Sequence, residues 1–210
     1  MSVAERRTQE RAQRKDEILQ AARTVLNEVG WHRTTVDAVA ERAQLSKGTI
    51  YLYFESKEAI LAELVLQALV NLSQELATAR DSCSLLQPEQ QLRAMAQAYF
   101  FFAQNAPDDF RLLTAYDGGS FQQGASHERQ EHLLAQSEFA LDLVAQVIAD
   151  GMALDLFLPG DARQIAGVLW AALNGALALV SHPVRRSMVA ADTSGFYNRT
   201  LELFLRGICK

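Results

Sequence analysis

The sequence predicts an all-α fold, with three helices in its first sixty residues and a larger helical domain after them. Along most of the 210 residues, apolar side chains recur at i, i+3 and i+4, the spacing of an amphipathic helix. No segment alternates apolar and polar residues as a half-buried strand does. All four prolines lie beyond residue 87, at the starts of predicted helices or between them. With 49% hydrophobic and 21% charged residues, the chain can bury a substantial core.

The first three predicted helices are closely connected. The first covers Asp16–Val29 and stops at Gly30, because glycine favours the conformation that ends a helix. Thr34-Thr35 offers a cap for the second helix, since a threonine hydroxyl can accept a hydrogen bond from a free amide of the first turn. After Gln44 the chain enters a short third helix, predicted over Ser46–Phe54. A tight connection between the second and third helices is typical of a helix-turn-helix.

The remaining helices are longer. Ser56 is predicted to cap a helix that reaches about Arg80, and Asp81–Gln87 is the first clear break. With Pro88 placed to start the next one, further helices are predicted at 89–105, 107–116, 126–150, 161–181 and 194–207. Three glycines mark the loosest loop: Gly118, Gly119 and Gly124.

Basic residues are concentrated at the N-terminus. The net charge is −5, but residues 1–60 carry ten Lys or Arg against nine Asp or Glu, a net of +1, which leaves −5 − 1 = −6 for residues 61–210. We predict that residues 1–15 form a flexible basic arm that contacts phosphates, the alternative being a solvated tail. Its basic side chains are Arg6, Arg7, Arg11, Arg14 and Lys15.

Several absences favour a cytoplasmic protein. Cys83 and Cys209 lie far apart and show no metal-type spacing, so neither a disulfide framework nor a metal site is predicted. The N-terminus is polar and rich in arginine, unlike a signal peptide. The apolar run Ile165–Val180 has sixteen residues, fewer than the ~18–20 that usually cross a bilayer, so we expect a helix buried by protein.

The two faces of the Ser46–Phe54 segment differ in a way that predicts contact with DNA. Ile50 and Phe54 point together toward the apolar stripes of the first two helices. The opposite face carries a glycine, a threonine and a leucine, flanked by two tyrosines. Glycine costs a helix roughly 1 kcal/mol relative to alanine, but it lets the backbone approach another surface closely. Threonine can donate to a base edge or a phosphate, and leucine can contact a thymine methyl group.

The ends of this segment are suited to phosphates. The tyrosine hydroxyls and Lys47 can reach a DNA backbone, and Ser46 leaves the positive helix N-terminus free for an anion. Lys57 lies in the first turn of the next helix, where the helix dipole disfavours a cation. A bound phosphate would offset that cost, so the short helix is predicted to lie in the major groove of DNA.

A series of short motifs runs from Ile18 to Lys57: IL-x-AA, a glycine that ends the first helix, TTV-x-x-(V/I)A, and LSKGTIYLYF-x-SKE. These roughly forty contiguous residues resemble the DNA-binding domain of TetR-family transcriptional regulators. Leu52 occupies the variable, groove-facing position, and Gln44 stands where the family commonly has glycine. If that residue is left-handed, the non-glycine side chain costs about 1 kcal/mol. The resemblance implies that eight further residues face DNA: Thr35, Ser46, Lys47, Gly48, Thr49, Tyr51, Tyr53 and Lys57.

The same resemblance implies a DNA-binding domain over 16–60, with its helix-turn-helix at about 35–54, and an effector-binding and dimerisation domain over 61–210. The family dimerises through its last two helices, which would form a four-helix contact about a two-fold axis. Packing within one chain is the alternative for some of these residues. The candidates are Ala166, Leu169, Trp170, Leu173, Gly175, Ala176 and Leu177, with Leu201, Phe204 and Leu205 of the terminal helix.

Aromatic residues beyond residue 98 are candidates for a ligand pocket. A pocket lined by aromatic rings, with one or two fixed polar groups, suits a hydrophobic or aromatic effector. For each ring the simpler interpretation is a core residue, whereas Asn174, an amide within an apolar helix, needs hydrogen-bond partners. The candidates are Tyr99, Phe102, Phe110, Tyr116, Phe139, Trp170 and Asn174.

No catalytic residue, metal site or cofactor is predicted. In HERQEH, His127 and His132 are five residues apart, or ~140° around a helix, whereas a zinc-protease pair is four apart on one face. A surface ion pair explains Glu128 and His132 more simply than a metal site.

The sequence therefore predicts a cytoplasmic, homodimeric transcriptional regulator. It would act as a repressor on a palindromic DNA operator and be released by a small hydrophobic or aromatic effector. The alternatives are an α-helical ligand-binding protein or enzyme without DNA binding, and a membrane-associated adaptor built around Ile165–Val180.

Overall fold

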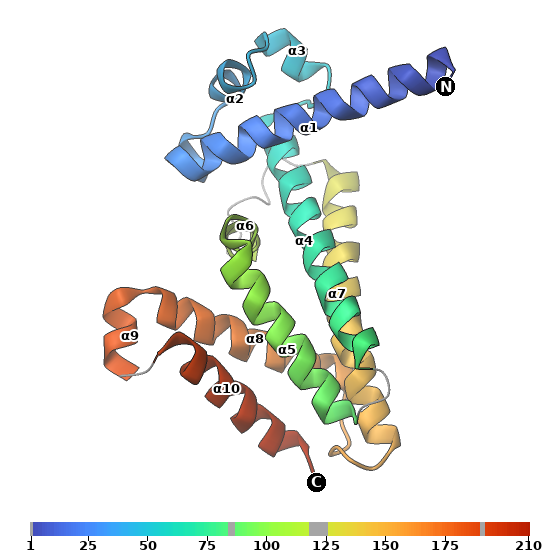
Figure 1. The fold of residues 1–210 in the computed structure, drawn as a ribbon, viewed down its shortest axis with the longest axis vertical. Coiled ribbons are helices and arrows are strands. Elements are labelled where there is room, and N and C mark those ends of the chain that lie inside the picture. Colours follow the sequence, from blue (N-terminus) through green and yellow to red (C-terminus); the bar gives the residue numbers. More distant parts are fainter. Residues whose placement is uncertain (1, 84–86, 118–125, 190–191) are drawn as a thin grey trace. The chain divides into compact units, whose positions relative to one another are not determined.

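The computed structural model describes residues 2–83, 87–117, 126–189 and 192–210 (Figure 1). The all-α prediction is confirmed, since the described residues contain no strand and only an isolated antiparallel bridge between Phe157 and Cys209. The chain forms two compact units. The first comprises Met1–Leu69 and Asp108–Ala135, and the second Val70–Pro107 and Gln136–Lys210. The predicted glycine loop at 118–124 lies outside the described residues.

The first helix, α1, covers Val3–Val29, so the predicted start at Asp16 is wrong and the basic segment predicted as a flexible arm is helical. A capping box explains the early start. The Ser2 side chain accepts a hydrogen bond from the Glu5 amide, and the Glu5 carboxylate accepts one from the Ser2 amide. Most residues that follow are strong helix formers. The helix ends as predicted at Gly30, whose φ is +78°.

A 3-10 turn, η1 (Trp31–Arg33), leads to α2 (Val36–Arg42) and α3 (Lys47–Tyr51). Of the two threonines predicted for the cap of α2, Thr35 is the one that caps it, and Ser46 caps α3. Thr35 accepts a hydrogen bond from the Ala38 amide at 3.1 Å, and Ser46 accepts one from the Thr49 amide at 3.0 Å. The third helix is shorter than predicted, because Leu52 and Tyr53 form a turn after it. Ile50 and Phe54 are buried, as their spacing predicted.

Gln44 lies in the turn between α2 and α3 and has a φ of +55°, in the left-handed region. We therefore expect Gln44→Gly to raise the free energy of unfolding by up to about 1 kcal/mol, because glycine has no Cβ to clash there. The greater freedom of glycine in the unfolded chain offsets part of the gain. Urea unfolding measures the difference, and Gln44→Ala, which keeps the Cβ, should show no gain. A Gly variant less stable than the Ala variant would contradict this explanation.

Three more helices contribute to the first unit: α4 (Lys57–Ser82), α6 (Pro107–Asp117) and α7 (His127–Ala153), of which α4 and α7 continue into the second. The predicted cap of α4 is confirmed by a hydrogen bond of 3.1 Å from the Ala59 amide to the Ser56 hydroxyl. Two carboxylates in the first turn of α6 bind α1. Asp109 is buried and pairs with Arg23, and Asp108 accepts a hydrogen bond from Asn27.

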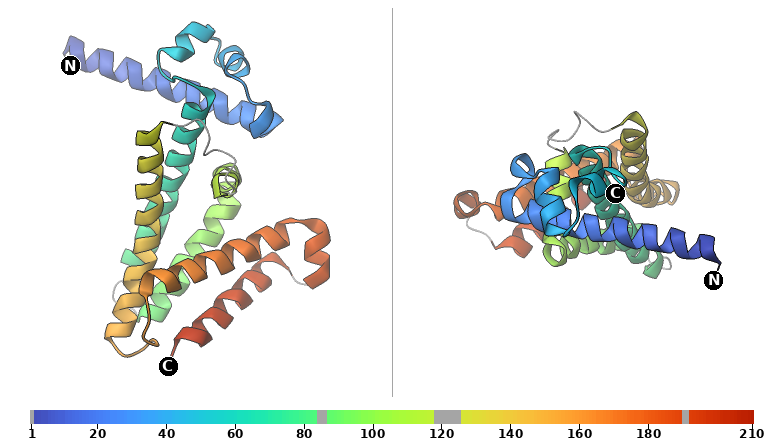
Figure 2. Two further views of the ribbon diagram at one scale, coloured as in Figure 1. Left: turned by 180° about the vertical axis from the view of Figure 1, so that it is seen from behind. Right: turned by 90° about the horizontal axis from the view of Figure 1, so that it is seen from above.

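The second unit adds α5 (Pro88–Asn105), α8 (Ala162–Ser181), α9 (Pro183–Val189) and α10 (Thr193–Ile208). Figure 2 shows α8 and α10 side by side, linked through α9, a helix that the sequence did not predict. Tyr197 of α10 is buried and donates a hydrogen bond of 2.7 Å to the Ala96 carbonyl of α5. Burial raises the pKa of this phenol, so it remains a neutral donor.

By length and composition alone, α4 and α8 are apolar enough to cross a membrane. The most apolar window of α4 is 61% buried inside the chain, which is typical of a core helix. The corresponding window of α8 is only 33% buried. Since α8 has 20 residues, the argument that its apolar run is too short to span a bilayer does not hold. Its uncovered apolar side needs another explanation.

Candidate nucleic-acid interface

The face of α3 opposite Ile50 is open, as predicted. Leu52 is 70% exposed and Tyr51 48% exposed, and Lys47 and Gly48 are also exposed. Thr49 and Tyr53 are partly exposed. The structure thus brings the predicted DNA-facing residues of 46–53 onto one accessible surface, which we call the reading face.

Gly48 is not needed for packing inside the protein. A Cβ at this position would meet only the Ser46 hydroxyl oxygen, at an ordinary 3.7 Å. Its backbone is helical, so no left-handed conformation calls for glycine either. The glycine therefore costs helix stability, roughly 1 kcal/mol, without an internal benefit. The glycine is thus compatible with the predicted close approach of an outside surface.

Lys47 is held beside the reading face by a carboxylate of α2. Its ammonium donates a hydrogen bond of 2.8 Å to Asp37, and this bond raises the pKa of Lys47. Asp37, in the first turn of α2, is a functional neighbour that sequence spacing alone does not mark. A phosphate that binds Lys47 must compete with this carboxylate or share the lysine with it.

We expect Lys47→Ala to weaken operator binding roughly ten-fold for each protomer bound, because a hydrogen bond to a charged group is worth about 1.5 kcal/mol or more. Asp37→Asn should have the opposite sign and tighten binding, since it removes a negative charge near the phosphates and frees the ammonium. Fluorescence anisotropy of a labelled duplex at fixed salt measures both. Weaker binding by Asp37→Asn, with the fold intact by circular dichroism, would show that Asp37 does not compete with a phosphate for Lys47.

Two cations lie against aromatic rings at the edges of the reading face. The Lys57 ammonium is 5.3 Å from the centre of the Trp31 ring, which offsets part of the dipole cost that the sequence argument assigned to a phosphate alone. The Arg11 guanidinium lies 5.1 Å from the centre of the Tyr53 ring. It also donates to the Leu52 carbonyl at 3.3 Å. Arg11 was predicted only as part of a flexible arm, and the length of α1 is what gives it a fixed place.

The predicted ligand residues fall into different environments. Tyr99 donates a hydrogen bond of 3.2 Å to the Asn174 side-chain oxygen, so this partly buried amide has a partner. Phe102 is buried, whereas Phe139 is 51% exposed and Trp170 46% exposed. Phe110 and Tyr116, both partly exposed, belong to the first compact unit. Of the seven candidates, the structure joins Tyr99 and Asn174 by a hydrogen bond.

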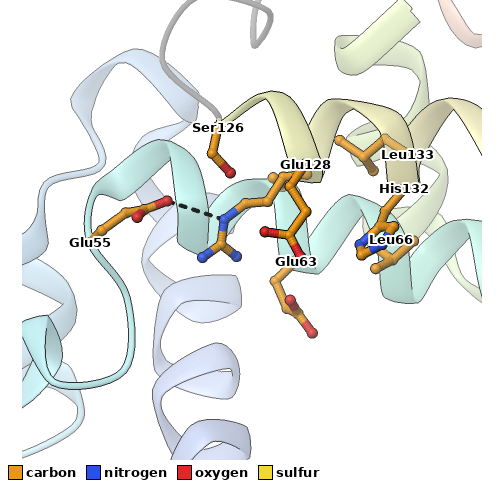
Figure 3. Close-up of a pocket in the computed structure, with 9 residues that line it drawn as sticks. Glu55, Glu63, Leu66, Ser126, Glu128, His132 and Leu133 are labelled. Carbon is orange, nitrogen blue, oxygen red and sulfur yellow. Dashed lines mark hydrogen bonds and ion pairs between the residues drawn. The ribbon is translucent and has the colours of Figure 1, made fainter.

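A pocket of about 270 Å³ lies in the first unit, between the start of α4 and the start of α7 (Figure 3). Its wall is polar and includes Glu55, Glu63, Glu128 and His132. At one end, Arg129 pairs with Glu55 at 3.3 Å. None of the seven predicted ligand residues lines this pocket, and its charges do not suit a hydrophobic effector.

The HERQEH segment forms the start of α7. His127 pairs with Glu131 at 3.2 Å, while Glu128 and His132 both line the pocket. Across the described ranges, no group of three or more His, Cys, Asp or Glu side chains is placed to hold a metal ion.

Comparison with known proteins agrees with this geometry. Residues 18–64 match the family described as bacterial regulatory proteins of the tetR family, and residues 92–204 match the tetracyclin repressor-like C-terminal domain. The chain is 32% identical over 111 residues to the transcriptional activator FasR of Mycolicibacterium smegmatis, covering 51% of this chain and 48% of FasR. It is 46% identical over 48 residues to a fatty acid metabolism regulator protein of Bacillus subtilis, covering 23% of this chain and 25% of that protein. It thus spans about half or less of these relatives.

Solved structures share the whole fold. A protein of unknown function from Rhodococcus sp. RHA1 superposes with a TM-score of 0.76 at 21% identity, over 94% of this chain and 95% of that one. FadR from Bacillus subtilis in complex with stearoyl-CoA gives 0.69 at 20% identity, over 91% and 98%. These identities establish likeness of fold alone, while the two family matches together cover the reading face and most of the C-terminal helices. The chain therefore belongs to the TetR family of bacterial regulatory proteins.

Proposed function

We propose that this regulator binds a palindromic operator as a cytoplasmic homodimer, with α3 of each protomer in a major groove. The observation that carries the proposal is Gly48. A glycine that the fold does not need lies at the centre of an exposed helix face, between side chains of a kind that can donate to phosphates and bases. Two such helices, related by a two-fold axis, require half-sites about one helical turn, ~34–36 Å, or somewhat further apart.

Selection of bound duplexes from a random-sequence library tests this proposal directly. The expected product is an inverted repeat, bound by two protomers, whose affinity falls steeply with added salt. Enrichment of no sequence, by a protein that is folded and dimeric, would refute specific operator binding.

The uncovered side of α8 supports the homodimer. Val168 is 60% exposed on α8, and Leu203 is 62% exposed on the neighbouring α10. Trp170 is 46% exposed and lies ~160° around α8 from Val168, beside the buried face of the helix. Gly175 of α8 is exposed too, and a Cβ there would meet nothing within 4 Å, so another helix has room to approach. The same faces from a second copy would bury these side chains in an isologous four-helix contact.

We expect Trp170→Ala to weaken the dimer at least ten-fold, because a tryptophan buried at an interface is a typical hot spot. Sedimentation velocity across a concentration series measures the monomer–dimer equilibrium. Leu134→Ala, which removes another exposed apolar side chain from α7, is the control and should leave the equilibrium unchanged. Unchanged dimerisation of the Trp170 variant would remove this residue from the interface.

The effector is proposed to be a small hydrophobic or aromatic molecule that binds the C-terminal domain near Tyr99 and Asn174, where a phenol and an amide meet. It releases the operator only if it binds the DNA-free state more tightly than the bound state. Stearoyl-CoA is a suitable first probe, since the FadR structure contains it and a similar curated protein is named for fatty acid metabolism.

Native mass spectrometry detects a copurified effector, and addition of the probe to the protein–duplex complex measures release. A promoter fusion separates a repressor from an activator. Deletion of the regulator should raise expression if the proposed repression is correct, and lowered expression would reverse that part of the proposal.

A further inference from the structure

The helical N-terminal segment of α1 carries basic side chains that differ in how they are neutralised. Arg6 pairs with Glu10 at 3.4 Å, Arg14 with Glu17 at 2.6 Å, and Lys15 with Glu63 at 2.6 Å. Across the described part of the chain, no carboxylate pairs with Arg7 or Arg11. Two guanidinium groups in this segment therefore keep an uncompensated charge.

These two arginines lie on one face of α1. They are four residues apart, so they are separated by about one turn, or ~6 Å along the axis, and by only ~40° around it. Arg6 precedes Arg7 by one residue and points ~100° away, which explains why it pairs with Glu10 instead. Arg7 and Arg11 are both exposed.

Contacts of Arg11 fix the direction of this face. Its guanidinium reaches the Leu52 carbonyl and covers the Tyr53 ring, so the face points toward the end of α3. Leu52 is among the most exposed apolar residues of the reading face. Arg7 lies one turn nearer the N-terminus of α1 than Arg11. Figure 1 shows that this end of α1 extends past α3. The pair thus continues the reading face beyond the helix-turn-helix.

We propose that Arg7 and Arg11 form a phosphate-binding stripe that extends the DNA contact of α3 along the flanking backbone. The inference rests on the proposed operator binding. Phosphates of one strand follow each other every ~3.4 Å along the duplex axis, so two guanidinium groups ~6 Å apart can serve different phosphates. Contacts to phosphates position the protein on DNA but do not distinguish base sequences. They should therefore raise the affinity of the protein for all operators equally. Arg11 has the additional role of positioning Tyr53 and the backbone that follows α3.

The test uses the full-length protein and the duplex selected by the wild type. Salt dependence of the binding constant is measured for Arg7→Gln and for Arg6→Gln, which removes the same charge one residue away. Each phosphate contact adds about 0.9 to the slope of log K against log salt, so two protomers should lose about 1.8 in Arg7→Gln. Between 50 and 200 mM salt, the wild type should then lose about ten-fold more affinity than this variant. Arg6→Gln should keep the wild-type slope.

Hydroxyl-radical footprinting gives a second readout. Arg7→Gln should lose protection at the outer backbone positions of each half-site and keep protection around the groove that holds α3. Equal salt slopes for the Arg7 and Arg6 variants, or an unchanged footprint, would refute phosphate binding by Arg7. Neither result would contradict operator binding by α3. Failure of the wild type to select any duplex would instead refute the proposed function itself.

Discussion

Gly48→Val is expected to abolish specific operator binding while the protein stays folded. The loss should bring affinity down to the non-specific level, roughly 10³-fold or more. A Cβ at Gly48 meets only the Ser46 hydroxyl at 3.7 Å, so the side chain has room within the protein. It has no room if the α3 backbone lies against the floor of a DNA groove. Electrophoretic mobility shift with the selected duplex measures the loss.

A graded series separates this steric block from a change in the helix. Gly48→Ala adds one methyl group and should lose less affinity than the valine variant. Both residues occupy helical backbone more readily than glycine, so thermal unfolding should show no loss of stability. Near wild-type affinity in a folded Gly48→Val protein would disprove close approach of the backbone, together with the argument that makes α3 the reading helix.

Asp109→Ala should lower the free energy of unfolding by about 3 kcal/mol, because it leaves Arg23 without its partner in a largely buried place. Asp109 is only 7% exposed, and it also lies in the first turn of α6, where the helix dipole favours an anion. Burial lowers the pKa of Arg23, and the nearby Asp108 carboxylate opposes that shift. Urea unfolding of the purified protein measures the loss.

Two further variants identify the ion pair as the cause. Asp108→Ala removes the neighbouring, more exposed carboxylate of the same turn, and it should cost less than about 1 kcal/mol. The double variant Arg23→Met with Asp109→Leu should recover most of the loss, since two apolar side chains of similar size can replace a buried pair at little cost. A double variant as unstable as Asp109→Ala alone would show that burial of an unpaired charge is not the reason.

Local chemistry explains why the helix-turn-helix was predictable from sequence. Each N-cap side chain bonds to an amide three residues further along the chain, as seen for Thr35, Ser46 and Ser56. Hydrogen bonds of such short range can be predicted from the residues nearby in the sequence. The sequence allowed a left-handed backbone at Gln44 only through the glycine that the family it resembles commonly has there, and the φ of +55° bears that out. The start of α1 was missed because its first four turns are polar, so apolar periodicity gave no signal and the Ser2–Glu5 capping box was overlooked.

Long-range pairings were not predictable in the same way. Arg23 and Asp109 are 86 residues apart, and nothing in the sequence selects Asp109 over the other carboxylates. The same holds for the C-terminal aromatics. Phe102 is buried and Trp170 is half exposed, yet each lies in a segment so rich in apolar residues that no single face is marked. Which face turns inward depends on the helices packed against it.

The bond between Lys47 and Asp37 also affects how many small ions leave when DNA binds. Lys47 is already paired with Asp37, so binding a phosphate exchanges the Asp37 carboxylate for the phosphate. That exchange changes the number of bound salt ions less than a new ion pair does. An arginine without such an internal counter-ion contributes its full share to the salt dependence of binding for each phosphate that it contacts. The number of phosphate contacts inferred from the salt dependence of binding should therefore be smaller than the number seen by footprinting. The difference should come from Lys47.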